Sequence, residues 1–155
     1  MLTIIGCGNS NRTDDGVGVY VAHCLLQFLQ TNPKEKVKVF DAGTGGIEVM
    51  FQARGSTRLI IIDASSSGSE AGAIFEVPGE ELERTREVSY SLHDFRWDDA
   101  LYAGRKIFRE DFPKDVKVFL IEAESLNYGL EMNQSVIAAA DKVVEKLKTV
   151  INEYE

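Results

Sequence analysis

The sequence predicts an α/β fold, a three-layer sandwich in which a mostly parallel, twisted sheet of about five strands carries helices on both faces. Short β-branched runs alternate with longer segments of helical periodicity, which is typical of a parallel sheet covered on both sides. The chain has 155 residues and no internal repeat or linker-like tract. We therefore expect one domain spanning residues 1–155.

The expected strands are the short β-branched runs at residues 2–6, 36–41, 58–63, 73–77 and 116–121. Two long helices are expected from apolar side chains spaced three or four residues apart. In the first helix these are Val17, Val21, Leu25 and Phe28. In the last helix they are Val136, Ala140, Val143, Val144, Leu147 and Ile151. Further helical segments are expected over residues 46–54 and 94–108, with a shorter one over 78–86.

Charge and composition exclude several classes of partner. The formal net charge is −8 and the pI is near 4.8, which disfavours nucleic acid and anionic lipid as partners. The apolar run over residues 59–62, like every other in the sequence, is too short to span a membrane, and the first residues lack a signal-peptide pattern. We expect a cytoplasmic monomer in which Cys7 and Cys24 stay reduced.

Acidic residues follow the ends of several expected strands. In an open α/β sheet the ligand crevice lies beyond the carboxyl ends of the strands. The first strand leads into Gly6-Cys7-Gly8 and then Asp15, the second ends at Asp41, the third at Asp63 and the fifth at Glu122. These four carboxylates, distant in sequence, are therefore expected at one edge of the sheet.

The glycine-rich turn Gly6-Cys7-Gly8 is a weak match to a phosphate-binding loop. Asn11 interrupts the dinucleotide fingerprint, and Asp14 and Asp15 would repel phosphate at the start of the following helix and favour a cation. The alternative interpretation is that Thr13 caps this helix and that the two acids complement its dipole.

The chain has two histidines. His23 lies next to the apolar stripe of the first long helix, and we expect no catalytic role for it. His93 precedes the helical segment over 94–108 and, taken alone, is equally consistent with a helix start. Together with Asp15 and Asp63 it would supply one nitrogen and two carboxylates. Such a set suits a borderline divalent metal ion and leaves coordination positions open for water or substrate.

Nucleophilic catalysis has less support in the sequence. There is no Gly-x-Ser-x-Gly nucleophile elbow. Cys7, at the end of the first strand, is better interpreted as a small buried core residue, because no residue in the sequence can be identified as a base beside it. Metal-assisted hydrolysis is the better-supported chemistry.

The chain contains five short motifs. None of them is specific alone, but their order and spacing together are. They are Gly6-Cys7-Gly8-Asn9 with Thr13-Asp14-Asp15-Gly16-Val17-Gly18, Asp41-Ala42-Gly43-Thr44, Leu59-Ile60-Ile61-Ile62-Asp63-Ala64, Ser91-Leu92-His93 and Gly129-Leu130-Glu131-Met132. Over nearly its whole length the chain thus resembles the hydrogenase maturation endopeptidases. It departs from the usual pattern of that family at Asn11, Ala42 and Asn133-Gln134.

The resemblance implies an endopeptidase that removes a short C-terminal extension from the large-subunit precursor of a nickel–iron hydrogenase after nickel insertion. It implies that Asp15, Asp63 and His93 form the catalytic, metal-contacting set, and that the substrate supplies the nickel. It assigns substrate recognition to Asp41, Gly43 and Thr44.

Two other functions stay open at this point. One is a non-enzymatic nickel-binding assembly protein on the same fold, because metal ligands imply binding and not cleavage. The other is a flavin- or nucleotide-binding module, which the two acids at the first long helix disfavour.

Overall fold

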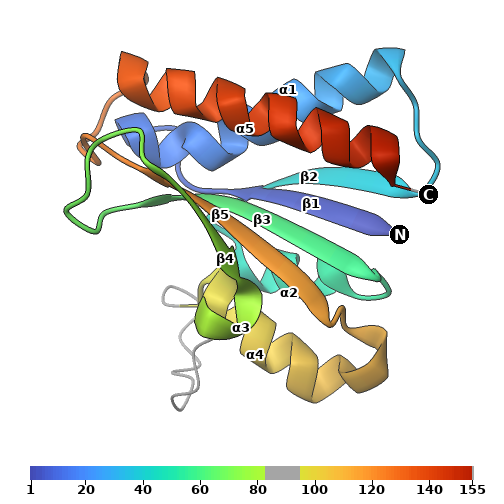
Figure 1. The fold of residues 1–155 in the computed structure, drawn as a ribbon. Coiled ribbons are helices and arrows are strands. Elements are labelled where there is room, and N and C mark those ends of the chain that lie inside the picture. Colours follow the sequence, from blue (N-terminus) through green and yellow to red (C-terminus); the bar gives the residue numbers. More distant parts are fainter. Residues whose placement is uncertain (83–94, 155) are drawn as a thin grey trace.

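A five-stranded sheet in the order β2-β1-β3-β5-β4 forms the centre of the computed structural model, which describes residues 1–82 and 95–154 (Figure 1). The strands are β1 (Leu2–Cys7), β2 (Val37–Gly43), β3 (Arg58–Ser65), β4 (Ile74–Pro78) and β5 (Asp115–Glu122). Only β4, at one edge, is antiparallel to its neighbour; the other pairings are parallel. The predicted fold class is confirmed, and every expected strand is present.

Helices cover both faces of the sheet. On one face lie α1 (Val17–Thr31) and α5 (Gln134–Glu153), and on the other lie α2 (Gly46–Ala53), the short α3 (Gly79–Leu82) and α4 (Trp97–Phe108) (Figure 1). The expected helix over 94–108 begins at Trp97; Phe95 and Arg96, which the structure describes, precede it and are not helical. Of the expected helical segment over 78–86, the structure describes the part that ends at Leu82. None of the described helices has the length and apolar character needed to cross a bilayer.

The core consists of two apolar layers that share the central strands. Successive side chains of a strand point to opposite faces, so Ile4 packs under α1 and α5 while Ile5 packs under α2 and α4. All six residues of β1 are buried. The apolar stripes predicted for the first and last long helices are buried in the first layer, with Phe28 at its margin. The central strands are therefore held from both sides, which fixes the positions of the loops that follow them.

The end of β2 departs from regular pairing. Gly6 of β1 pairs with Asp41, but the next residue, Cys7, pairs with Gly43, so that Ala42 is skipped. A bulge of this kind changes the face on which the following side chains lie. The backbone N–H of Gly8 then donates to the carbonyl oxygen of Gly43 at 2.8 Å. The loops after β1 and β2 are thereby joined at one edge of the sheet.

Candidate active site

A cleft of about 490 Å³ opens at the carboxyl ends of β1, β2 and β3. Its walls come from four stretches distant in sequence: residues 7–15, residues 43–49, Asp63, and residues 95–97, with Tyr128 at the rim. The crevice predicted beyond the strand ends is therefore present. Asp15 and Asp63, two of the three predicted catalytic residues, both line it.

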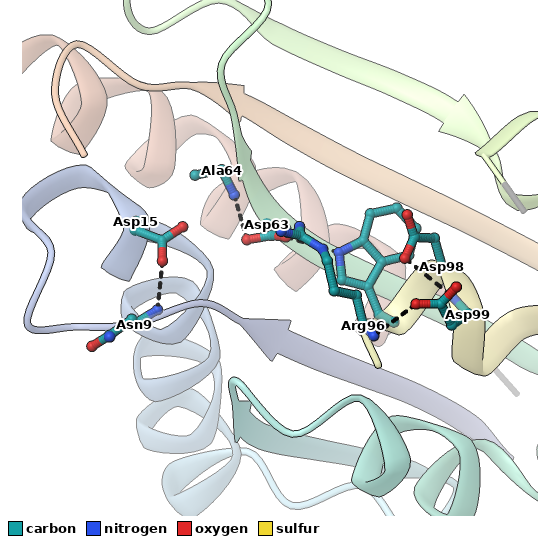
Figure 2. A network of polar contacts seen from close by, with 8 residues as sticks. Asn9, Asp15, Asp63, Ala64, Arg96, Asp98 and Asp99 are labelled. Atoms are coloured by element: carbon teal, nitrogen blue, oxygen red, sulfur yellow. Dashed lines mark hydrogen bonds and ion pairs between the residues drawn. The ribbon is translucent and has the colours of Figure 1, made fainter. Parts of the chain in front are cut away.

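Asp15 lies in the short 3-10 turn Thr13–Gly16 that precedes α1. One of its carboxylate oxygens, Oδ2, accepts a hydrogen bond from the backbone N–H of Asn9 at 3.0 Å (Figure 2). Gly8 has a φ of +134°, and a Cβ there would lie 1.9 Å from the Asp15 carbonyl oxygen and 3.6 Å from Oδ1 of Asp63. Only glycine fits this position. Its small size lets the backbone of the Asp15 turn approach the Asp63 carboxylate.

Asp63 is the buried carboxylate of the cleft, with only 5% of its side chain exposed. Its Oδ1 accepts from the backbone N–H of Ala64 at 2.8 Å. Its Oδ2 accepts from the indole N–H of Trp97 at 2.8 Å and from the Arg96 guanidinium at 3.3 Å (Figure 2). The carboxylate is thus fixed in orientation by three donors from two different segments.

Burial dominates the acid–base behaviour of Asp63. Loss of hydration raises its pKa to about 6, against the lowering effect of the Trp97 hydrogen bond, the Arg96 charge and the Ala64 N–H. The charge of Asp15 raises the pKa further. At neutral pH Asp63 is therefore an ionised carboxylate in poorly hydrated surroundings. Such a group binds a cation more strongly than an exposed carboxylate does.

Asp14, next to Asp15, has an entirely different environment. It is fully buried, and its carboxylate accepts four hydrogen bonds. The donors are the backbone N–H groups of Glu124, Ser125 and Asn133 and the side-chain amide of Asn133, at 2.7–2.9 Å. Burial opposes the charge, but these bonds outweigh it and keep the pKa of Asp14 below its usual value. Asp14 therefore joins the first turn to the segment before α5.

One part of the alternative interpretation of the first turn, the helix cap at Thr13, is wrong. The Thr13 hydroxyl donates to the carbonyl oxygens of Ser125 and Asn127, at 2.7 and 3.1 Å, and caps no helix. Asn133 stands at the N-cap of α5, but its side chain donates to Asp14 and does not cap its own helix. Both side chains are used for tertiary contacts, which sequence periodicity does not report.

The predicted recognition residues separate in the structure. Gly43 and Thr44 line the cleft. Asp41 turns away toward α1, where its Oδ2 lies 2.7 Å from Nε2 of His23, while its Oδ1 accepts from the backbone N–H of Gly43 at 2.9 Å. Asp41 thus supports the loop that carries the other two residues. His23, for which no catalytic role was expected, lies outside the cleft lining.

Glu122 does not join the aspartates in the cleft, although it lies at the end of β5 as expected. Its carboxylate accepts from the hydroxyl groups of Ser65 and Ser67 and from the backbone N–H of Ser67. It therefore orders the loop after β3. Strand-end position alone places these acids along one edge but does not direct their side chains.

His93 lies outside the described residues, as does the whole Ser91-Leu92-His93 motif. Within residues 1–82 and 95–154, no three His, Cys, Asp or Glu side chains are grouped closely enough to hold a metal ion. Asp15 and Asp63 are the two described carboxylates of the cleft. The predicted three-ligand set stays a prediction.

Cys7 is buried at the base of the cleft, as expected for a small core residue. Burial, reinforced by the negative charge of Asp63, raises the pKa of its thiol well above the usual value. The group is therefore a neutral thiol at physiological pH, which is unsuited to attack on a peptide bond.

Sequence reasoning missed four residues of the cleft. Arg96 and Trp97 hold Asp63 from the start of α4. Arg12 and Tyr128 form the rim: the guanidinium lies 4.7 Å from the centre of the Tyr128 ring and donates to its hydroxyl at 3.2 Å. One signal was available, because Trp97 is the only tryptophan in the chain and follows His93 closely. The partners of Arg12 are distant in sequence and gave none.

The fold and the cleft define an α/β enzyme whose catalytic candidates are carboxylates at parallel strand ends. The model of the hydrogenase maturation protease family matches residues 19–150, and the chain belongs to that family. It is therefore a protease, a class of hydrolase. Family membership favours the enzyme over the nucleotide-binding module and over the non-enzymatic assembly protein.

Known relatives agree with this assignment over most of the chain. The hydrogenase 2 maturation protease of Escherichia coli is 28% identical, covering 98% of this chain and 91% of the relative. The hydrogenase expression/formation protein HoxM of Cupriavidus necator is 27% identical, covering 94% and 71%. The structure of the hydrogenase maturating endopeptidase HybD from E. coli matches with a TM-score of 0.80 and 26% identity, covering 98% of this chain and 92% of that one.

Proposed function

We propose that this protease removes a C-terminal extension from the large-subunit precursor of a nickel–iron hydrogenase, and that it recognises nickel already held by that precursor. Asp15, Asp63 and His93 would contact the metal. The observation that carries the proposal is the pair of carboxylates in one cleft, one of them buried and fixed in orientation. The names of the relatives, which concern hydrogenase maturation, support the choice of substrate.

The chemistry of the cleft suits this role. Two carboxylates offer oxygen ligands that a divalent ion accepts, and a histidine would add a nitrogen ligand. Three protein ligands leave positions for groups from the precursor and for water. Asp63 is fixed by Trp97 and Ala64, so its free lone pairs have a defined direction. Gly43 and Thr44 border the same space and would contact the peptide near the bond that is cut.

The test compares three substrates: nickel-free precursor, nickel-loaded precursor, and nickel-free precursor given enzyme that was pre-incubated with nickel and then desalted. Mass spectrometry follows the loss of the C-terminal peptide. Only the nickel-loaded precursor should be cut. Efficient cleavage of the nickel-free precursor by chelator-treated enzyme would contradict metal recognition, and the carboxylates would then act by general acid–base catalysis.

Variants identify the residues responsible. Asp63→Asn and His93→Ala should each lower the cleavage rate about 100-fold or more, because loss of a ligand costs at least as much as loss of a group supporting it. The matched control is Asp115→Asn, at the opposite end of the sheet, where Asp115 makes an exposed ion pair with Arg58. It should cleave at the wild-type rate. Wild-type rates in Asp63→Asn or His93→Ala would remove that residue from the mechanism.

A further inference from the structure

Arg96 is a charged residue of the cleft to which the proposed function gives no task. Its guanidinium nitrogen Nη2 lies 3.3 Å from Oδ2 of Asp63, the oxygen that Trp97 also contacts. The Asp63 side chain is 5% exposed, whereas that of Arg96 is 57% exposed. The ionic partner of this buried carboxylate is thus a long side chain whose charged group is accessible to solvent.

The backbone of Arg96 is firmly anchored although its side chain is exposed. Its N–H donates to Oδ2 of Asp99 at 3.0 Å, within the first turn of α4. Gly46, at the start of α2, touches the same segment so closely that a Cβ there would lie 2.8 Å from the Arg96 carbonyl oxygen. The neighbouring Trp97 is buried. The guanidinium can therefore leave Asp63 by side-chain rotation, without moving the wall of the cleft.

The charges that line the described cleft cancel. Asp15 and Asp63 contribute two negative charges, and Arg12 and Arg96 contribute two positive ones. The whole chain carries −8, but the cleft itself has no net charge to attract a free divalent cation. Arg12 is held at the rim by Tyr128. Within the part of the chain that the structure describes, Arg96 is the arginine of the two that contacts one of these aspartates, Asp63.

We propose that Arg96 is a built-in counter-ion of Asp63, which nickel must displace, so that the enzyme binds free nickel poorly and accepts nickel presented by the precursor. This inference rests on the proposed nickel recognition. It makes Arg96 a specificity-determining residue, because it separates metal that a precursor carries from metal in solution.

The competition follows from electrostatics. A guanidinium and a divalent ion at the same carboxylate repel each other strongly at distances of a few ångströms, so one must leave. Free nickel gains only its contacts with the aspartates against this cost. Nickel held in a precursor arrives with peptide contacts to the rest of the cleft, which raise its effective concentration at Asp63. Arg96 thus weakens the binding of free nickel and of precursor-held nickel alike, but it prevents only the binding of free nickel.

The experiment measures nickel binding to the enzyme alone, at about pH 8 where carboxylates are ionised. Calorimetry gives the affinity, and the emission of Trp97, the only tryptophan, reports whether nickel reaches Asp63. Arg96→Gln and Arg96→Met should bind nickel at least about tenfold more tightly than wild type. Arg96→Lys should restore the wild-type affinity. The matched control, Arg12→Gln, removes the same charge from the same cleft and should change the affinity by less than about threefold.

Unchanged or weaker nickel binding in Arg96→Gln and Arg96→Met, with thermal unfolding like that of wild type, would overturn the inference and make Arg96 a positioning group for Asp63. Adding Asp63→Asn to Arg96→Gln should abolish the gain; a gain that persists would place the metal elsewhere and would also overturn it. The proposed function fails separately, if wild-type enzyme cuts nickel-free precursor. If wild-type enzyme cuts nickel-free precursor while Arg96→Gln binds nickel more tightly, the proposed function is rejected. The role of Arg96 as a counter-ion of Asp63 would still stand.

Discussion

Asp14 and Asp15 are neighbours in sequence, but they belong to two regions of opposite design. The Asp14 carboxylate is buried and saturated by four donors from residues 124–133. Asp15 uses one oxygen for a single backbone hydrogen bond and faces the cleft. A carboxylate whose lone pairs are all used holds structure together, whereas one with lone pairs free can bind a ligand. The number of donors around a carboxylate therefore separates scaffold from site here.

The largest effect is expected from Asp14→Ala, which leaves four buried donors without an acceptor. The free energy of unfolding should fall by about 3–5 kcal/mol. Asp15→Ala should cost less than about 1 kcal/mol while lowering the cleavage rate about 100-fold. Urea unfolding and precursor cleavage, measured on both variants, check the comparison. Equal losses of stability would show that Asp15 is as structural as its neighbour.

Asp63 combines features of both regions, because it is buried and yet faces the cleft. Burial raises its pKa to about 6, so the ionised form opposes folding by roughly 3 kcal/mol at neutral pH. Asp63→Asn removes that charge but keeps only one acceptor oxygen, so that either the Ala64 N–H or the Trp97 and Arg96 donors lose their acceptor. We expect the free energy of unfolding at pH 7 to rise by about 1–2 kcal/mol, together with loss of cleavage. A clear loss of stability would mean that the ion pair with Arg96 outweighs burial.

The two buried aspartates should also respond to pH in opposite directions. The pKa of Asp14 is lowered by folding, so its contribution is complete above the unfolded value of about 3.9 and is lost as the pH falls below it. The pKa of Asp63 is raised, so its contribution is greatest below about 3.9 and is lost as the pH rises to about 6.

Unfolding curves at pH values from about 3 to 7 test these signs. The stability gained by Asp63→Asn should grow between about pH 4 and pH 6 and then level off. The stability lost by Asp14→Ala should stay constant above about pH 5 and shrink below about pH 4. Parallel profiles for the two variants would contradict the assigned shifts.

The smallest effect is expected at an exposed carboxylate. Asp41 is paired with His23, whose side chain is 61% exposed, and exposed pairs contribute only about 0–1 kcal/mol. His23→Gln should therefore change the free energy of unfolding by less than about 0.5 kcal/mol. If Asp41 supports the Gly43–Thr44 loop, the KM for precursor should rise by a few-fold with an unchanged kcat. A change in kcat instead would bring His23 into the catalytic step.

The elements of the fold were predictable because their signals are local. The apolar run over residues 59–62 and the helical stripe of α5 each reveal one element and its buried face. The convergence of Asp15 and Asp63 at one edge followed from the rule for parallel strand ends. These predictions needed only the direction of each strand and the position of its last residue.

The directions of individual side chains were not predictable. Thr13 and Asp14 turn to residues more than a hundred positions away, and the Glu122 side chain turns to Ser65 and Ser67 instead of the cleft. Such contacts depend on packing between distant segments and leave no periodic trace in the sequence. The same reason kept Arg96 and Tyr128 out of the predicted site.

The Asp14 contacts also bear on when the enzyme becomes active during its synthesis. The turn that carries Asp15 is joined to residues 124–133 by the Asp14 carboxylate, by Thr13, and by backbone bonds between Gly129 and the residues around Arg12. None of these can form until the segment before α5 has left the ribosome. A nascent chain that ends after α4 could already fix Asp63 through Arg96 and Trp97, but the turn that carries Asp15 would lack its anchor to residues 124–133. Proteolytic competence is thus delayed until the last part of the chain has folded.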